Sequence, residues 1–308
     1  MWEINLIAAM RAVEKSMGYA VYRFGLCMGV ALGYLFATLA GAGTLVGFGS
    51  LAKNALALGP FGALIGFALF GYLMFRIRST WLNHVTVPQL GIVADQIMGR
   101  PIPTGKALVE YAKNRQQACY PSTTGIFELD LSIRQVLEDI ANLHPCPKLP
   151  ADQGLFARSS LRVSGFFAKL NHETILAWHF FESHDNTWQS ATRALAVFDR
   201  SFGLFLKNRV IAFTFSWLGF ALAFPVILGG IRMLVEDIPI NMSVWPLVFA
   251  GVFSWAIKAA FLDAIAEAAL LELLSKEMNT FSGSAAPRLK DQSAAYRNME
   301  IKSGQFLS

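Results

Sequence analysis

The chain has 308 residues, of which 54% are hydrophobic and 15% are charged, and its mean hydropathy is +0.44. A soluble domain carries about 25% charged residues, so this composition argues against a soluble protein and favours a membrane protein. The net charge of +5 is small enough to come from Lys and Arg beside membrane spans, and no nucleic-acid partner is expected.

The first part of the chain, residues 1–78, is predicted to form an amphipathic segment and a transmembrane hairpin. Residues 1–23 mix polar and apolar side chains, so we expect an amphipathic helix lying on the membrane. The uncharged runs at about 24–48 and 55–75 are long enough to span a bilayer, which takes about 20 apolar residues. The short linker between them leaves room only for an antiparallel pair.

Glycines recur on this hairpin in a pattern that is typical of close helix packing. Gly25, Gly29 and Gly33 are four residues apart in the first run, and Gly62 and Gly66 are four apart in the second. Small residues at this spacing share one helix face and let two backbones approach. We therefore expect the two helices to pack through these faces, and a bulky residue at Gly29 is expected to disturb assembly.

Residues 79–207 are predicted to form a cytoplasmic or interfacial helical section. Ser132 to Gln135 has the capping-box pattern of a helix start. From Asn186, aromatic residues recur at helical spacing opposite a charged face, which is typical of a helix at the membrane interface. An ordinary amphipathic helix packed on protein is the alternative, and the position before a span favours the interface. The expected interfacial residues are Trp188, Phe198, Phe202 and Phe205.

Residues 208–278 are predicted to form a second transmembrane hairpin, with spans at about 210–231 and 244–266, and residues 279–308 a disordered cytoplasmic tail. Lys and Arg flank the spans mainly at the two termini and in the middle section. Because basic residues mark the cytoplasmic side, both termini are expected in the cytoplasm, with the protein in a plasma or bacterial inner membrane.

The predicted fold is all-α: a polytopic integral membrane protein with four transmembrane helices as two hairpins, plus amphipathic interfacial and cytoplasmic helices. The lipid bilayer is the expected partner, together with a homo-oligomer or a membrane-complex partner.

The last helix carries the charges that set the functional hypothesis. Lys258, Asp263 and Glu267 are predicted as substrate-path candidates. Asp263 and Glu267 are four apart and share a face, whereas Lys258 is about 140° from Asp263 around a regular helix. The alternative is depth: counted from Val244 at about 1.5 Å per residue, Lys258 lies about 21 Å into the membrane and Asp263 at the cytoplasmic boundary. Lys258 is then the charge expected inside the bilayer.

An enzyme is not expected. The sequence has no phosphate-binding loop, serine nucleophile elbow, zinc-protease motif or dinucleotide fingerprint. His179 and His184 could form a small polar cluster with Glu182, but isolated histidines explain them better. Cys119 and Cys146 lack metal-ligand spacing and are expected as isolated thiols. No cofactor and no metal site are predicted.

Short motifs follow one another in the last third of the chain, over roughly residues 166–277. They are, in order, FFAKLN at Phe166–Asn171, Ser190-Ala191, Asn208-Arg209-Val210, Asp237-Ile238-Pro239, Trp245-Pro246, and the pair Asp263 and Glu272. In this order they resemble the C-terminal part of the choline transporter-like family. That family has more spans and an outer domain with disulfides, so the resemblance implies a transporter-like fold whose single copy lacks a complete substrate path.

The sequence thus predicts a multi-pass, transporter-like membrane protein that binds or moves a small organic cation or lipid. The alternative is a non-catalytic membrane anchor or scaffold whose cytoplasmic section docks a partner complex. The two differ in one structural requirement, because transport needs a polar cavity between the spans and an anchor does not.

Overall fold

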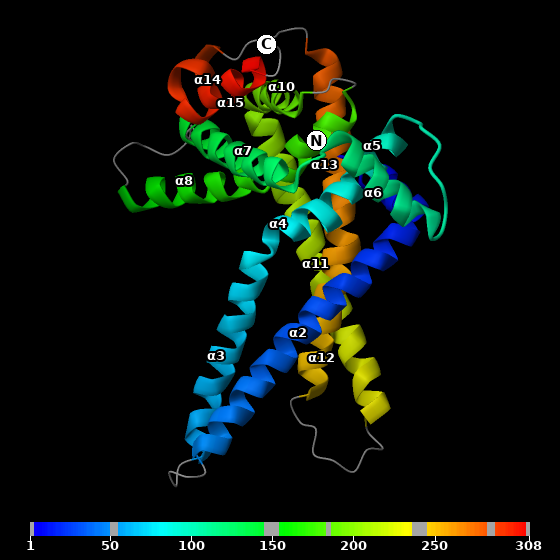
Figure 1. Cartoon of the computed structure of the whole chain (residues 1–308), viewed down its shortest axis with the longest axis vertical. Helices are drawn as coiled ribbons and strands as arrows, with labels where there is room; N and C mark the ends of the chain where they lie inside the picture. The colour runs from blue at the N-terminus through cyan, green and yellow to red at the C-terminus, as the bar shows by residue number, and fades with distance from the viewer. Residues whose placement is uncertain are drawn as a thin grey trace. The chain divides into compact units, whose positions relative to one another are not determined.

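The computed structural model describes residues 3–49, 55–144, 154–182, 186–235, 245–281 and 287–305. Of these described residues, 90% are helical and none lies in a strand, which confirms the predicted all-α class (Figure 1). Four helices are long and apolar enough to cross a membrane, as predicted, so the chain is a multi-pass membrane protein. These candidate spans are Met17–Gly49, Leu58–Arg76, Phe202–Leu234 and Pro246–Thr280.

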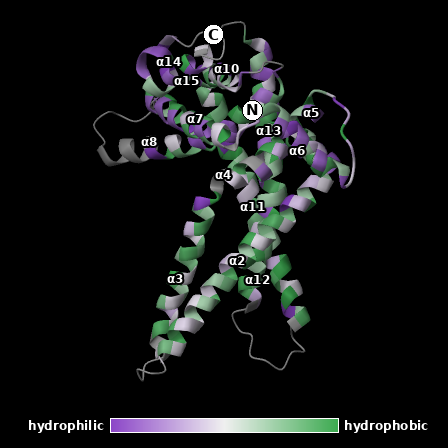
Figure 2. Ribbon diagram, in the orientation of Figure 1, coloured by the Kyte–Doolittle hydropathy of each residue, from purple (hydrophilic) through white to green (hydrophobic). Residues whose placement is uncertain are grey.

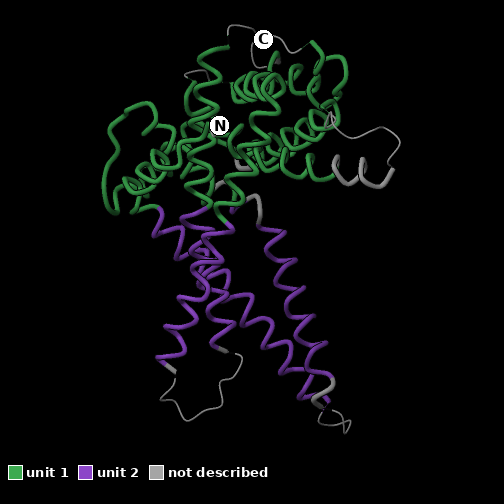
Figure 3. The backbone as a smooth tube through the Cα atoms, turned by 180° about the vertical axis from the view of Figure 1, so that it is seen from behind, with its two compact units in different colours: residues 1–19, 82–216, 263–308 green, residues 20–81, 217–262 purple. Residues whose placement is uncertain are grey.

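The chain divides into two compact units, each assembled from separated segments (Figure 3). Unit 1 comprises Met1–Tyr19, Leu82–Ser216 and Asp263–Ser308, and unit 2 comprises Ala20–Trp81 and Trp217–Leu262. The predicted boundaries instead divided the chain in sequence order. They differ because long helices run through the division: α11 (Phe202–Val235) begins in unit 1 and ends in unit 2.

Unit 2 holds the most apolar helices, which are coloured mainly as hydrophobic in Figure 2. Proline does not interrupt them, since Pro60 and Pro225 both lie inside continuous helices. The last span changes geometry at a five-residue π-helical turn, η4, a feature that often marks functional sites. The helices of unit 2 are α2 (Met17–Gly49), α3 (Ala55–Arg76), α4 (Arg78–Trp81), the later part of α11, α12 (Trp245–Ile257) and η4 (Lys258–Leu262).

Helices α2 and α3 approach each other backbone to backbone. A Cβ atom added to Gly41 or to Gly62 would overlap the carbonyl oxygen of the other residue, and one added to Gly66 would overlap the carbonyl oxygen of Ala37. Only glycine permits this distance, because any side chain would meet backbone that cannot move aside. Gly62 and Gly66 therefore have the packing role that the sequence predicted.

The earlier glycines of α2 have a different environment. Gly33 faces the ring of Phe70, but Gly25 and Gly29 are exposed, and no atom of the described chain would lie within 4 Å of a Cβ added to either. Their predicted packing role is wrong within one chain. Spacing identifies residues that share a face, but it does not say which part of a 33-residue helix meets its neighbour.

Unit 1 is a bundle of shorter helices, in which α7 packs on α8, α1 on α13, α10 on α15 and α5 on α6. Its helices are α1 (Leu6–Lys15), α5 (Val87–Ile97), α6 (Ala107–Cys119), α7 (Thr123–Leu143), α8 (Gly154–Lys169), α9 (His172–Ala177), α10 (Thr187–Arg200), the start of α11, α13 (Asp263–Thr280), α14 (Pro287–Gln292) and α15 (Ala294–Gln305), with the short turns η2 (Leu82–Thr86) and η3 (Trp178–Phe180).

The amphipathic helix α1 packs on protein, where the sequence predicted a helix lying on the membrane. The side chain of Asn5 caps its start by accepting a hydrogen bond from the Ala8 amide at 3.1 Å. Its apolar face buries Ala9 and Val13 against α13 and α5. An apolar helix face can be buried against a membrane surface or against other helices. Amphipathicity alone therefore did not distinguish the two environments.

The predicted helix start at Ser132 is wrong, because Ser132 lies inside α7. The cap is Ser122, whose hydroxyl accepts a hydrogen bond from the Gly125 amide at 3.2 Å. The hydroxyl of Ser132 donates to the carbonyl of Glu128 one turn earlier, which lets serine remain inside a helix. The residues after Ser132 nevertheless form an apolar helix face, since Val136, Leu137 and Ile140 are fully buried.

The predicted interfacial aromatics are buried in protein, so their assignment to the membrane interface is wrong. Trp188, Phe198, Phe202 and Phe205 are at most 7% exposed. The side chain of Asn186 caps α10 by accepting hydrogen bonds from the amides of Trp188 and Gln189. The helix ends at Ser201, before α11 begins. Helix α10 is covered by α7, α13 and α15, which is the alternative of an amphipathic helix packed on protein.

The predicted disordered tail is helical over residues 287–305. Helices α14 and α15 bury Leu289, Tyr296 and Met299, which are at most 2% exposed. Between them, the Ser293 hydroxyl donates to Asp139 at 2.5 Å and accepts from the Tyr296 amide at 3.1 Å. The segment was predicted to be disordered because most of its residues are polar. Its few apolar residues nevertheless pack it against α7 and α10. Residues 282–286 and 306–308 lie outside the described residues.

Candidate functional site

The candidate site is a cavity of about 280 Å³ within unit 2. Ligand pockets have volumes of about 300–1,000 Å³, so this cavity is at the small end and suits a lipid headgroup or a similarly small molecule. It is lined by Arg23, Cys27, Val30 and Tyr34 of α2, Met74 of α3, Trp81 of α4, Trp255 of α12 and Ala259 of η4.

One face of α2 forms the main wall of this cavity. Its four lining residues follow each other at steps of three and four, which places them in a single stripe. The ring of Tyr34 is held in place by Phe67 and Phe70, with centroid separations of 5.1 and 4.7 Å. Cys27 is only 1% exposed. This wall is therefore well packed and its ring positions are fixed.

The lining combines one permanent positive charge with three aromatic rings. The guanidinium of Arg23 suits the oxygens of a phosphate, which it can bind with two parallel N–H donors. The rings of Tyr34, Trp81 and Trp255 can attract an ammonium group through their faces. A ligand that carries both groups matches this lining, whereas a bare cation meets the repulsion of Arg23.

Lys258, the first substrate-path candidate, lies in η4 of unit 2. Its ammonium nitrogen is 4.9 Å from the ring centroid of Trp217, which is a cation–π distance. Lys258 is not among the residues that line the cavity, although the next residue, Ala259, is. The π-helical turn also changes the angular relation to Asp263 that was counted on a regular helix.

The two acidic candidates lie in unit 1. Asp263 accepts a hydrogen bond from the hydroxyl of Ser216. Glu267 is buried and ion-paired with Arg209. Lys258 therefore lies in unit 2, and Asp263 and Glu267 lie in unit 1, so their role as a substrate path stays a prediction.

Arg209 and Glu267 form a buried, fork-like ion pair. Their two contacts measure 2.5 Å (Nη1 to Oε1) and 3.1 Å (Nη2 to Oε2), and Arg209 is 5% exposed. Thr174 donates to Glu267 at 3.2 Å, and Arg209 also donates to the Asn171 side chain and the Leu170 carbonyl. The pair thus links α11 and α13 to the segment around α9, and its role is to position helices.

A second polar cluster joins α7 to α9. Asp130 accepts from Nδ1 of His172 at 2.6 Å and from Nε of Arg134 at 2.9 Å. Burial alone would raise the pKa of Asp130, but the hydrogen bonds from His172 and Arg134 outweigh it and hold this pKa below its usual value of 3.8. The ionised carboxylate is the form that the fold stabilises.

This cluster predicts an acid-sensitive contribution to stability. Because the pKa of Asp130 is depressed in the folded state, its stabilisation is complete above pH 3.8 and is lost as the pH falls through the folded-state pKa. Asp130→Asn is expected to unfold more easily at pH 7, by about 1–3 kcal/mol, and to lose less further stability on acidification than the wild type. Thermal unfolding between pH 7 and pH 3 measures this, and parallel pH profiles would contradict it.

The buried carboxylate of Asp95 ties α5 to α6. It accepts from Tyr111 at 2.7 Å, from Arg100 at 2.9 Å and from Arg115 at 3.2 Å. Burial, followed by the hydrogen bond to Asp95, raises the pKa of Tyr111, so this phenol stays protonated as a donor. The cluster is a structural joint with its hydrogen bonds satisfied.

The sequence favoured isolated histidines over a cluster of His179, Glu182 and His184, and His184 lies outside the described residues, as does Cys146. Nδ1 of His179 is 3.0 Å from the hydroxyl of Ser190, and Glu182 pairs with Arg193 at 2.8 Å. Within the described ranges, no three His, Cys, Asp or Glu side chains form a metal-binding group.

Comparisons of the chain with protein families, curated proteins and solved structures give no match. The resemblance to the choline transporter-like family therefore stays a prediction.

Proposed function

We propose that this protein binds a zwitterionic phospholipid through the cavity in unit 2. The observation that carries the proposal is the lining itself, with Arg23 beside Tyr34, Trp81 and Trp255. The phosphate of the headgroup would pair with the guanidinium, and the ammonium group would lie against the rings. The sequence predicted a small organic cation or a lipid as the ligand. The proposal narrows that ligand to a lipid whose headgroup carries a negative phosphate and a positive ammonium group.

The surroundings of the cavity favour a lipid over a free cation. Only 11% of the most apolar window of α2 is buried inside the chain, and the same holds for the window of α3. Large apolar side chains such as Phe36 and Phe67 are more than half exposed. These surfaces suit acyl chains that extend from a bound headgroup, because apolar contact is favourable there.

The same exposure bears on transport. The first three spans are only 11% buried in their most apolar windows and the fourth 33%, so one chain offers little wall for an enclosed path, and a lipid would move along the helix surface or between copies. The anchor or scaffold alternative needs the same spans but no ligand. We place the protein in a plasma or bacterial inner membrane with both termini in the cytoplasm, because Lys and Arg flank the spans on that side.

A binding measurement on the purified full chain in detergent tests the proposal. Short-chain phosphatidylcholine is expected to bind and to raise the unfolding temperature, whereas choline at the same concentration has little effect. Arg23→Gln is expected to weaken lipid binding about tenfold, because a charged donor to the phosphate is lost. The matched control is Arg76→Gln, which removes an exposed arginine of α3 outside the cavity lining.

Equal binding by the wild type and Arg23→Gln would overturn the proposed headgroup orientation. Binding of choline as tight as that of the lipid would point to a cation site. A failure of every ligand to bind would favour the anchor alternative.

A further inference from the structure

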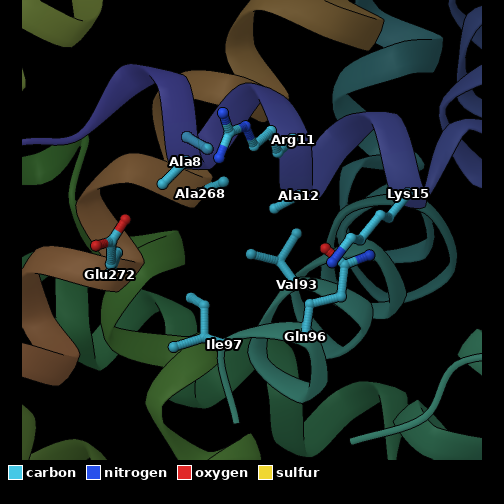
Figure 4. Close-up of a pocket in the computed structure, with 10 residues that line it drawn as sticks. Ala8, Arg11, Ala12, Lys15, Val93, Gln96, Ile97, Ala268 and Glu272 are labelled. Carbon is cyan, nitrogen blue, oxygen red and sulfur yellow. The ribbon is translucent and has the colours of Figure 1, made fainter. Parts of the chain in front are cut away.

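Unit 1 contains a second cavity, of about 300 Å³, between α1, α5 and α13 (Figure 4). Its walls are mostly small apolar side chains of these helices. Four polar residues interrupt them: Arg11 and Lys15 of α1, Gln96 of α5 and Glu272 of α13. The proposed lipid cavity of unit 2 shares none of these residues.

Gln96 has unused hydrogen-bonding capacity at this cavity. Both its Nε2 and its Oε1 are shut off from solvent, and neither has a hydrogen-bond partner in the described part of the chain. Buried amide atoms are almost always paired, so two unpaired atoms on one side chain need an explanation. A ligand that offers an acceptor and a donor would satisfy both.

The charges around the cavity are separated by sign. Arg11 and Lys15 are four residues apart and share a face of α1, and among the described residues no carboxylate pairs with either. Glu272 lies at the opposite end of the cavity from Lys15 and Gln96 (Figure 4). Glu272 forms an ion pair with Lys276, whose Nζ lies 2.7 Å from Oε1. A carboxylate accepts several hydrogen bonds, so Glu272 retains capacity for a second donor.

We propose that this cavity binds a small zwitterion that carries a phosphate and a primary ammonium group. Arg11 and Lys15 pair with the phosphate, and Nε2 of Gln96 donates to one of its oxygens. The ammonium group donates to Glu272 at the other end of the cavity. A primary amine is specified because the lining has hydrogen-bond acceptors and no aromatic ring, the reverse of what a quaternary ammonium needs.

Two sources can supply this chemistry: the ethanolamine headgroup of a phospholipid, or a free phosphorylated amine. Lys15 lies two residues before Met17, where the first candidate span begins, so this wall of the cavity is close along the chain to a membrane segment. The recognition is the same for either source, and soluble and membrane-embedded probes distinguish them.

The test uses the full chain and four probes. Glycerophosphoethanolamine and glycerophosphoglycerol, which lacks the amine, are titrated calorimetrically into protein in detergent. Nanodiscs that contain phosphatidylethanolamine or phosphatidylglycerol in a phosphatidylcholine background supply the lipid form. The variants are Arg11→Gln/Lys15→Gln, Glu272→Gln and Gln96→Leu. The control is Arg162→Gln/Arg288→Gln, which removes two exposed arginines of unit 1 outside the cavity lining.

The double variant of α1 is expected to weaken binding of the ethanolamine probe at least tenfold, and Gln96→Leu several-fold, with the control unchanged. Glu272→Gln is expected to reduce the preference for ethanolamine over glycerol. Binding of the soluble probe supports a free ligand, and binding only in nanodiscs supports a lipid headgroup. Absence of binding by every probe, or equal loss in the control, overturns the proposal. Because Arg23→Gln leaves this cavity intact, failure of the proposed lipid site in unit 2 is separately visible.

Discussion

Arg209→Met is expected to lower the free energy of unfolding by about 3–5 kcal/mol, because it leaves Glu267 charged and buried without its partner. The bidentate contact and the low exposure of both side chains make this charge removal costly. Denaturant or thermal unfolding of the full chain in detergent measures the effect. The matched control, Arg162→Met, removes an exposed arginine and should change stability by less than about 0.5 kcal/mol.

A double variant separates the burial of charge from the loss of packing. Arg209→Met/Glu267→Met removes both charges, so it is expected to be more stable than Arg209→Met alone. Two results would contradict this explanation. In the first, Arg209→Met loses no more stability than the control. In the second, the double variant loses as much stability as the separate losses at Arg209 and Glu267 added together.

Gly62→Leu is expected to prevent the close approach of α2 and α3, with a loss of about 3 kcal/mol or more in the stability of the folded chain. The new Cβ would meet the carbonyl oxygen of Gly41, so relief requires the backbone itself to shift. The expected result is less monodisperse protein after solubilisation and a lower unfolding temperature.

Gly29→Leu provides the control within the same helix pair. Gly29 is exposed, and nothing in the described chain would lie within 4 Å of the added Cβ. It should therefore behave as the wild type as a monomer. If Gly62→Leu and Gly29→Leu lose equal stability, the close contact between α2 and α3 is not what stabilises the fold. If only Gly29→Leu loses stability, the face of α2 that carries Gly29 contacts a second copy of the chain.

The long helices were predictable from the sequence because each consists of an uncharged run that only a membrane or a protein core can accept. Their partners were not. Phe198 and Phe205 have the spacing of an interfacial helix, yet both are buried in protein, and α10, which carries Phe198, packs on the distant C-terminal helix α15. Contacts between remote segments leave no local pattern.

The candidate sites show the same limit. Lys258 and Asp263 attracted notice as charges in an apolar helix, but sequence distance could not show that the units divide between Leu262 and Asp263. Arg209 was noted only as part of a motif, although a charge at the start of a span signals the need for a buried partner. Trp81 and Trp255 are far apart in sequence, and only the fold brings them to one cavity with Arg23.

Native mass spectrometry of the full chain tests the central proposal most directly. The protein is released from detergent after incubation with equal amounts of phosphatidylcholine and phosphatidylglycerol. The account predicts that the wild type and Arg76→Gln retain phosphatidylcholine preferentially, and that Arg23→Gln loses this retention. Equal retention by Arg23→Gln and the wild type, or no preference between the two lipids, would contradict a zwitterionic headgroup site in unit 2.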